Sequence, residues 1–265
     1  MSIWKYEHIG RYERGDILRE TCLYCPQSIL KRLKDEPGGT LHGSSPFVSV
    51  TVVRACPLCG WWNAVYEHSS YAEWVRRGDE FRGAAAVLRE LDKADQSAGI
   101  NEVRDFLAAH YESRFGVNPR IFEEVATSVF RDLGFRAIVT AYTKDGGIDC
   151  MLNNGTNSIG VQVKCTKNVV GVEQIRALAG ALQLENMTEG MFVTTSRFSS
   201  VAETTAEKYL TVDRPTKIEL LDAGRFFDAL QIAQRTVFRD VSEIATSYDW
   251  FFNLPIYAGK SGFLR

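Results

Sequence analysis

The spacing of apolar residues changes along the chain between a helical and a strand period. In residues 120–134 (RIFEEVATSVFRDLG) apolar side chains recur every three or four positions, which predicts an amphipathic helix that ends at Gly134. The following runs FRAIVTAYT, IDCML and IGVQVKC are short and rich in strand-forming residues, and the turn sequences KDGG and NNGTNS separate them. This pattern predicts an antiparallel meander of three strands.

Helical and strand patterns then alternate. VEQIRALAGALQLEN predicts a helix, GMFVTTS a strand, SSVAETTAEKYL a second helix, and KIELLDAGRFFDALQ one more strand and helix. A strand, helix, strand succession implies a right-handed crossover with parallel pairing. We therefore expect a mixed α/β sheet flanked by helices over residues 119–265, although no pattern places the aromatic end SYDWFFNLPIYAGKSGFLR.

The chain before Pro119 has a different texture. Residues 1–75 are rich in Trp, Tyr and Gly and hold two pairs of cysteines, whereas DEFRGAAAVLRELDKA and INEVRDFLAAHYESRFG carry helical patterns. The sequence thus predicts three regions: a small domain at residues 1–75, a helical connector at 76–118 and the α/β domain at 119–265.

Composition describes an ordinary soluble protein. The 265 residues are 45% hydrophobic with a net charge of -2, so attraction for a polyanion has to come from local basic residues such as Arg131, Arg136, Lys167 and Arg176. No run approaches the roughly 18 apolar residues of a membrane span. The start lacks the apolar core of a secretion signal, which favours the cytoplasm, where cysteines stay reduced.

Polar residues interrupt the predicted hairpin at positions where a strand should be apolar. Side chains alternate across a strand, so Gln162 and Lys164 share one face, and a hairpin register can bring Asp149 to the same side. Hard cations such as Mg²⁺ take oxygen ligands, and an adjacent lysine can orient water or neutralise a transition state, which are the parts for phosphodiester hydrolysis. The alternative is a hairpin whose polar face is simply hydrated. A lone lysine in a covered central strand costs several kcal/mol unless it is paired, which favours a site.

The ordered segments IFEEVATSVFRDLG, DGGIDCML, IGVQVKC and GMFVTTSRFS resemble the catalytic domain of the Mrr-like restriction endonucleases, a branch of the PD-(D/E)xK nuclease superfamily. The resemblance covers residues 119 to 225. It implies a restriction-endonuclease-like fold in which Asp149 is the metal-binding aspartate and Lys164 the catalytic lysine. Gln162 takes the position of the usual Asp or Glu, and Glu123, rather than its neighbour Glu124, approaches the metal through water.

Two neighbouring features have competing interpretations. The TTS sequence and Arg197 after the fourth strand could meet phosphate, or they could cap the following helix. Cys150, beside Asp149, is interpreted as a small buried hydrophobic residue.

Four cysteines in the first domain have the spacing of a metal site. Cys22, Cys25, Cys56 and Cys59 form two C-x2-C pairs, and in a reduced compartment this spacing predicts tetrahedral structural zinc in a zinc-ribbon-like domain, with two disulfides as the alternative. His42 is not needed as a ligand. Four thiolates leave no open position for catalysis. Trp61 and Trp62 beside the second pair could stack on bases or pack a small metal domain.

The expected function is a Mg²⁺- or Mn²⁺-dependent endodeoxyribonuclease of restriction or phage defence, acting on DNA in the cytoplasm. Cutting both strands at once needs two active sites, so a homo-oligomer is expected, and a partner protein of a defence system would be compatible. The alternatives are a non-catalytic nucleic-acid-binding or adaptor protein on a nuclease fold, and a nuclease that acts on RNA or branched DNA.

Overall fold

The computed structural model describes residues 4–6, 19–25, 28–38, 47–72, 75–88, 91–92, 97–140, 147–212, 215–236 and 257–258. The chain forms two compact units, Leu91–Val237 and a second one composed of Ser2–Glu90 with Phe238–Arg265. Within the described ranges, no helix has both the length and the apolar character needed to cross a bilayer.

The unit Leu91–Val237 contains a five-stranded mixed sheet in the order β10-β9-β8-β7-β6. Its strands are β6 (Arg136–Val139), β7 (Cys150–Asn153), β8 (Ser158–Lys164), β9 (Glu189–Thr194) and β10 (Lys217–Leu221). β6, β7 and β8 pair antiparallel, whereas β9 pairs parallel with both β8 and β10. The predicted meander and the predicted parallel crossover are both confirmed.

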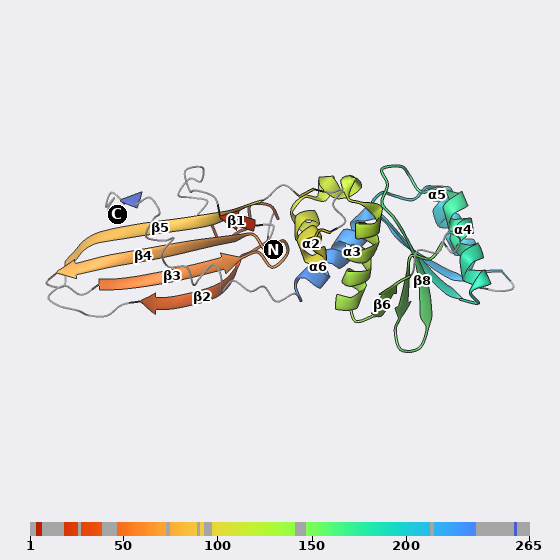
Figure 1. Ribbon diagram of the computed structural model, residues 1–265, viewed down its shortest axis with the longest axis horizontal. Helices are drawn as coiled ribbons and strands as arrows, with labels where there is room; N and C mark the ends of the chain where they lie inside the picture. The colour runs from red at the N-terminus through yellow and green to blue at the C-terminus, as the bar shows by residue number, and fades with distance from the viewer. Residues whose placement is uncertain are drawn as a thin grey trace. The chain divides into compact units, whose positions relative to one another are not determined.

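Helices cover both faces of this sheet (Figure 1). They are α2 (Ile100–Ala109), the 3-10 helix η2 (Tyr111–Gly116), α3 (Pro119–Asp132), α4 (Val172–Leu184), α5 (Ser200–Lys208) and α6 (Ala223–Gln234). Phe122 of α3 and Phe226 of α6 are fully buried against Val161 of β8 in one core, while α4 and α5 pack around Phe192 of β9 in another. The expected mixed α/β architecture is therefore present.

The sequence signals at both ends of α3 fix its position. Asn118 caps its first turn, because the Asn118 Oδ1 accepts a hydrogen bond of 2.9 Å from the Arg120 backbone N–H, and Pro119 begins the helix. Gly134 follows its end with a φ of 97°, a conformation that glycine adopts without steric cost. The helix presents its apolar side to the sheet, so Glu123 is held near the start of a fixed element.

Two glycines let α4 approach the sheet closely. Gly160 of β8 and Gly190 of β9 are direct partners in the strand register. A Cβ atom at Gly160 would lie 2.7 Å from Leu182 Cδ2, and one at Gly190 would overlap the end of the same leucine. Leu182 is fully buried, so a larger residue at either position requires Leu182 or α4 to shift.

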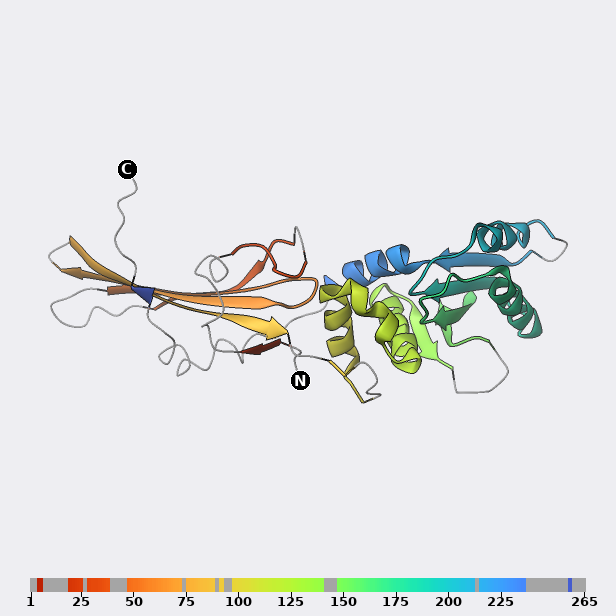
Figure 2. The same cartoon turned by 90° about the horizontal axis from the view of Figure 1, so that it is seen from above.

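The second unit is built on an antiparallel sheet in the order β1-β5-β4-β3-β2, with β11 also paired to β5. Its strands are β1 (Trp4–Tyr6), β2 (Lys31–Gly38), β3 (Phe47–Ala55), β4 (Trp62–Ala72), β5 (Val75–Leu88) and β11 (Tyr257–Ala258). Figures 1 and 2 show β3, β4 and β5 as long neighbouring strands. Of the aromatic end that the sequence left unplaced, the described residues are those of β11.

The prediction of a helix at residues 79–94, the first part of the helical connector, is wrong. Residues up to Leu88 belong to β5, which pairs with β4 from Val75 to Ala85. The run Ala84–Ala86 has high helix propensity, but this is worth only about 1 kcal/mol per residue at most. Long-range pairing and the burial of Ala85 and Ala86 outweigh it. The second predicted helix of that region is confirmed as α2, followed by η2.

Candidate active site

Asp149 lies immediately before β7, at the end of the sheet where the pairing of β7 with β8 stops. Its backbone N–H donates to the Val161 carbonyl over 2.7 Å, and its Oδ2 accepts from the Val163 backbone N–H over 2.7 Å. The side chain is thereby fixed against β8 next to Gln162. Asp145 and Gly146 of the same motif lie outside the described residues.

Gln162 presents a buried amide oxygen at this position. Its Oε1 has no hydrogen-bond partner within the described part of the chain. A buried polar atom left in this state costs about 1–3 kcal/mol, so it calls for a ligand or a functional reason.

Lys164 follows on the same face of β8, at the strand end, and is half-buried. Its carbonyl accepts hydrogen bonds from the Thr194 Oγ1 over 3.0 Å and from the Thr195 N–H over 3.2 Å. The backbone that carries the lysine is therefore held by the end of β9.

Glu123 approaches from the first turns of α3. Its Oε2 lies 2.9 Å from Arg120 Nη1, and its side chain is 14% exposed. The neighbouring Glu124 lies 3.6 Å from Arg120 Nε and its side chain is 40% exposed. Of the two glutamates, Glu123 is the more enclosed.

The two enclosed carboxylates interact electrostatically. Burial raises the pKa of Glu123, and the negative charge of Asp149 raises it further, while Arg120 opposes both effects. Burial also raises the pKa of Asp149, against the hydrogen bond from Val163 and the charge of Arg120. Each carboxylate thus resists ionisation because of its surroundings, and a cation between them would relieve this cost.

The donor set fits a hard divalent cation. Two carboxylates and one unpartnered amide oxygen supply only oxygen atoms, which is the ligand type that Mg²⁺ and Mn²⁺ prefer. The three residues that the sequence assigned to such a site come from the position before β7 (Asp149), from β8 (Gln162) and from α3 (Glu123).

Arg120 is the charged residue of this region that the sequence interpretation passed over. A signal for it existed, because Arg120 and Glu123 stand three residues apart at the start of a predicted helix, a spacing at which side chains meet. The helix prediction alone could have placed the arginine beside the glutamate.

The TTS segment has structural partners. The Thr195 hydroxyl donates to the Thr166 carbonyl over 3.0 Å and accepts from the Thr166 N–H over 2.8 Å, and Ser199 caps α5 through the Ala202 N–H. The cap of α5 is therefore Ser199, rather than the TTS segment or Arg197, to which the sequence interpretation gave this role, and Thr195 instead ties β9 to the loop that follows β8. Cys150 is fully buried, and burial raises the pKa of its thiol to about 11, which agrees with a packing role.

The four cysteines of the second unit converge. The Sγ atoms of Cys22, Cys25, Cys56 and Cys59 lie within 4.8 Å of one another, all four residues are buried, and none of the four forms a disulfide. Backbone N–H groups point at the sulfurs, as from Cys25 to Cys22 Sγ and from Trp61 to Cys59 Sγ, each at 3.4 Å. Such a closed set of thiols could bind zinc, and the alternative of two disulfides is not observed.

The turn around the second cysteine pair has the geometry of a metal knuckle. Gly60 has a φ of 80°, and its N–H donates to the Cys56 carbonyl over 3.0 Å. Hydrogen bonds from the neighbouring thiols, Cys22 first, lower the pKa of Cys56, which favours a thiolate. His42 lies outside the described residues.

Trp61 and Trp62 pack the unit that contains the cysteines. They are 0% and 6% exposed, and the Trp61 Nε1 donates to the Ala86 carbonyl over 2.9 Å. Neither ring is available for stacking on a base, so the packing interpretation holds.

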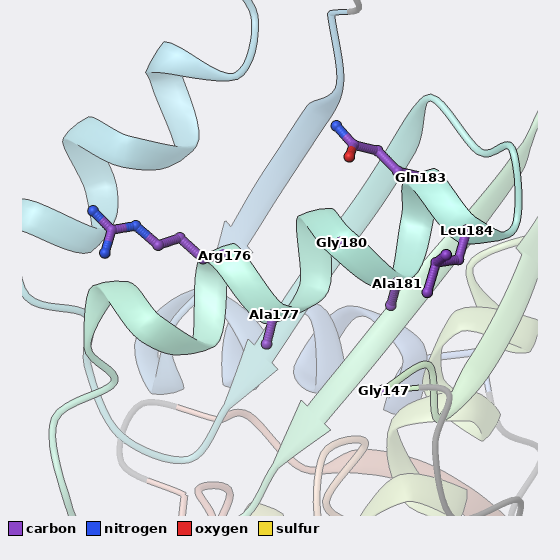
Figure 3. Close-up of a pocket in the computed structure, with 7 residues that line it drawn as sticks. All are labelled: Gly147, Arg176, Ala177, Gly180, Ala181, Gln183 and Leu184. Carbon is purple, nitrogen blue, oxygen red and sulfur yellow. The ribbon is translucent and has the colours of Figure 1, made fainter.

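A shallow depression lies beside α4, on the side where Ala177, Ala181 and Leu184 point toward Gly147 (Figure 3). Small residues form its floor, and Arg176 and Gln183 project away from it. Its lining consists of Gly147, Arg176, Ala177, Gly180, Ala181, Gln183 and Leu184. It lacks the carboxylates, histidines and cysteines of a catalytic or metal site.

Comparisons with known proteins address the unit that holds Asp149. Residues 116–230 match the model of the Mrr_cat family, described as restriction endonuclease. The type IV methyl-directed restriction enzyme EcoKMrr of Escherichia coli (strain K12) is 33% identical over an alignment of 125 residues, and the match covers 44% of this chain and 40% of that enzyme. The solved structure of restriction endonuclease FokI matches with a TM-score of 0.37 at 11% identity, covering 63% of this chain and 36% of that one.

Proposed function

We propose that this protein is a metal-dependent endodeoxyribonuclease of restriction or phage defence in the cytoplasm, because residues 116–230 match the Mrr_cat restriction endonuclease family and the site described above fits a divalent metal. The observation that carries the proposal is the buried, unpartnered Oε1 of Gln162 on the strand that holds Asp149 by a hydrogen bond. An oxygen of this kind is costly in a purely structural hairpin and useful in a metal site.

Asp149, Gln162 and Glu123 are the proposed metal-binding residues. A divalent cation held by their oxygens would supply positive charge beside the scissile phosphate and lower the pKa of the attacking water. The hydrogen bond from Val163 keeps the Asp149 carboxylate oriented without a change at the moment of reaction.

Lys164 is the proposed catalytic lysine. Its ammonium group stands on the same face of β8 as Gln162, where it can orient water and neutralise the charge that develops on the phosphate oxygens. The hydrogen bonds from Thr194 and Thr195 to its carbonyl hold this position.

The test is a plasmid-cleavage assay with Mg²⁺ and with Mn²⁺, on methylated and unmethylated DNA. The wild-type protein should nick or linearise DNA, Lys164→Ala and Asp149→Ala should not, and Lys208→Ala, an exposed lysine of α5, should retain full activity. The methylated substrate is included because the similar E. coli enzyme is described as methyl-directed.

Persistence of cleavage in the Lys164→Ala and Asp149→Ala proteins would contradict the assignment. DNA binding without cleavage by any form would favour the adaptor alternative, and parallel reactions with single-stranded RNA and branched DNA distinguish the substrate alternatives.

We further propose that the four cysteines bind a structural zinc ion. The cysteines are buried, and backbone N–H groups of Tyr24, Cys25 and Trp61 donate to their sulfurs, so the ion would stabilise the second unit rather than act on substrate. Metal analysis of the purified protein should find one zinc per chain, and none in a variant that lacks two of the four thiols.

A further inference from the structure

A positively charged side chain, Arg120, lies beside the proposed metal ligands. Arg120 contacts Glu123 at 2.9 Å and Glu124 at 3.6 Å, and its charge also acts on Asp149. Its guanidinium group therefore stands in the field of both carboxylates that we assign to the metal.

Gln162 limits the negative charge that the proposed site offers to a metal ion. Where a second strand carboxylate would add negative charge, glutamine adds none, so Asp149 and Glu123 are the anionic members of the proposed ligand set. One of these two is already neutralised by a close ion pair with Arg120. A divalent ion that enters has to overcome the repulsion of this arginine.

We propose that Arg120 is an electrostatic gate on the metal site: it neutralises Glu123 in the free protein, keeps divalent-metal binding weak, and releases the carboxylate when metal and DNA phosphate arrive together. This inference rests on the proposed nuclease function and concerns the regulation of the same site.

The exposure of Arg120 permits this exchange. Its side chain is 35% exposed, whereas that of Glu123 is 14% exposed, so the arginine can turn toward an incoming phosphate while the glutamate stays enclosed. A guanidinium group binds phosphate oxygens as readily as carboxylate oxygens. The DNA would thus supply the negative charge that the free site lacks, and by linkage the metal would favour DNA binding by the same factor.

The experiment is a calorimetric titration of the zinc-loaded full chain with Mn²⁺ in the absence of DNA. Arg120→Gln removes the charge, Arg120→Lys retains it, and Arg176→Gln is the matched control, because Arg176 and Glu173 form an ion pair of the same spacing at 3.3 Å on exposed α4. Asp149→Ala combined with Arg120→Gln shows that the ion measured is the one at this site.

Removal of the arginine should tighten Mn²⁺ binding by at least about tenfold, since a unit charge one or two contact distances from a divalent ion has about this effect even when water screens the pair fully. Arg120→Lys and Arg176→Gln should bind as weakly as the wild type, and the Asp149→Ala double variant should lose the tight binding. The Mg²⁺ concentration for half-maximal cleavage, which is measured with DNA present, should change much less than the Mn²⁺ affinity measured without DNA, because DNA phosphate already draws Arg120 away from Glu123.

Unchanged or weaker Mn²⁺ binding by folded Arg120→Gln would overturn the gate, as would equal tightening in Arg120→Lys. Failure of the gate is distinguishable from failure of the nuclease proposal: in the first case the wild type still requires Asp149 for metal-dependent cleavage, and in the second case neither Mn²⁺ binding nor cleavage depends on Asp149.

Discussion

At Gln162 the chain buries an amide oxygen without a hydrogen-bond partner among the described residues. The sequence singled out this residue because it shares a strand face with Lys164, but the strand pattern could not show that its oxygen lacks a partner. The unpartnered oxygen lowers the free energy of unfolding of the metal-free protein, and it provides a ligand when a metal ion binds. The two can therefore be separated by experiment.

Gln162→Met keeps the length of the side chain and removes the unpartnered oxygen. We expect the metal-free protein to gain about 1 kcal/mol in the free energy of unfolding, because the desolvation cost disappears, while cleavage is lost. Urea unfolding in EDTA checks the first result and the plasmid assay the second. Gln183→Met on the exposed face of α4 is the control and should change neither; a destabilised but active Gln162→Met would contradict the assignment.

Asp149 gives a prediction about pH. Its pKa is raised in the fold by burial, so its contribution to stability is present below the unfolded value, 3.8, and is lost as the pH rises through the higher folded value. In metal-free protein at pH 7, Asp149→Asn should raise the melting temperature, and the difference from wild type should vanish as the pH approaches 3.8. Thermal melts across this range measure it. A difference that grows toward acid pH would mean that the carboxylate is instead stabilised by its partners.

At the scale of elements, the contact between α4 and the sheet depends on the adjacent glycines of β8 and β9. Gly190→Ala should destabilise the unit by about 1–3 kcal/mol, because the added methyl group overlaps Leu182 in a closed core. Gly180→Ala, on the outer face of the same helix with no atom near its Cβ position, should stabilise by about 0.5–1 kcal/mol. Chemical denaturation of both variants tests the opposite signs, and a neutral Gly190→Ala would show that Leu182 can move aside.

Elements with a clear apolar period could be predicted from the sequence. The α3 helix and the β7–β8 hairpin carry their own local signals, a cap with a terminal glycine in the one case and turn residues in the other. β5 could not be predicted, because Ala84–Ala86 give a helical signal that only the long-range pairing of the strand with β4 overrides. For the candidate site, strand alternation and the family resemblance predicted four residues, which are Glu123, Asp149, Gln162 and Lys164. The position of Arg120 relative to Asp149 could not be predicted, because it depends on how the start of α3 packs against the sheet.

At the scale of the whole molecule, the two units should respond differently to loss of zinc. Cys56→Ser removes one of four mutually close thiols, so the second unit should lose bound zinc and unfold at lower temperature. The unit Leu91–Val237 has its own two cores and should keep its transition. Calorimetry with metal analysis tests this, and the buried Cys150→Ser, which is not part of the thiol cluster, is the control that should retain zinc. One transition shifted as a whole would show that the units unfold together.

The pairing of β11 with β5 has a consequence for protein synthesis. Tyr257 of β11 lies opposite Phe81 of β5. The sheet of the second unit therefore contains a strand that is synthesised after all of Leu91–Val237, although its other strands are synthesised before that unit. On the ribosome all residues of the unit Leu91–Val237 are synthesised before those of β11, so the backbone of β5 opposite β11 stays unpaired until then. A translation pause or a nonsense codon soon after Val237 would therefore leave the unit Leu91–Val237 complete and the second unit without β11.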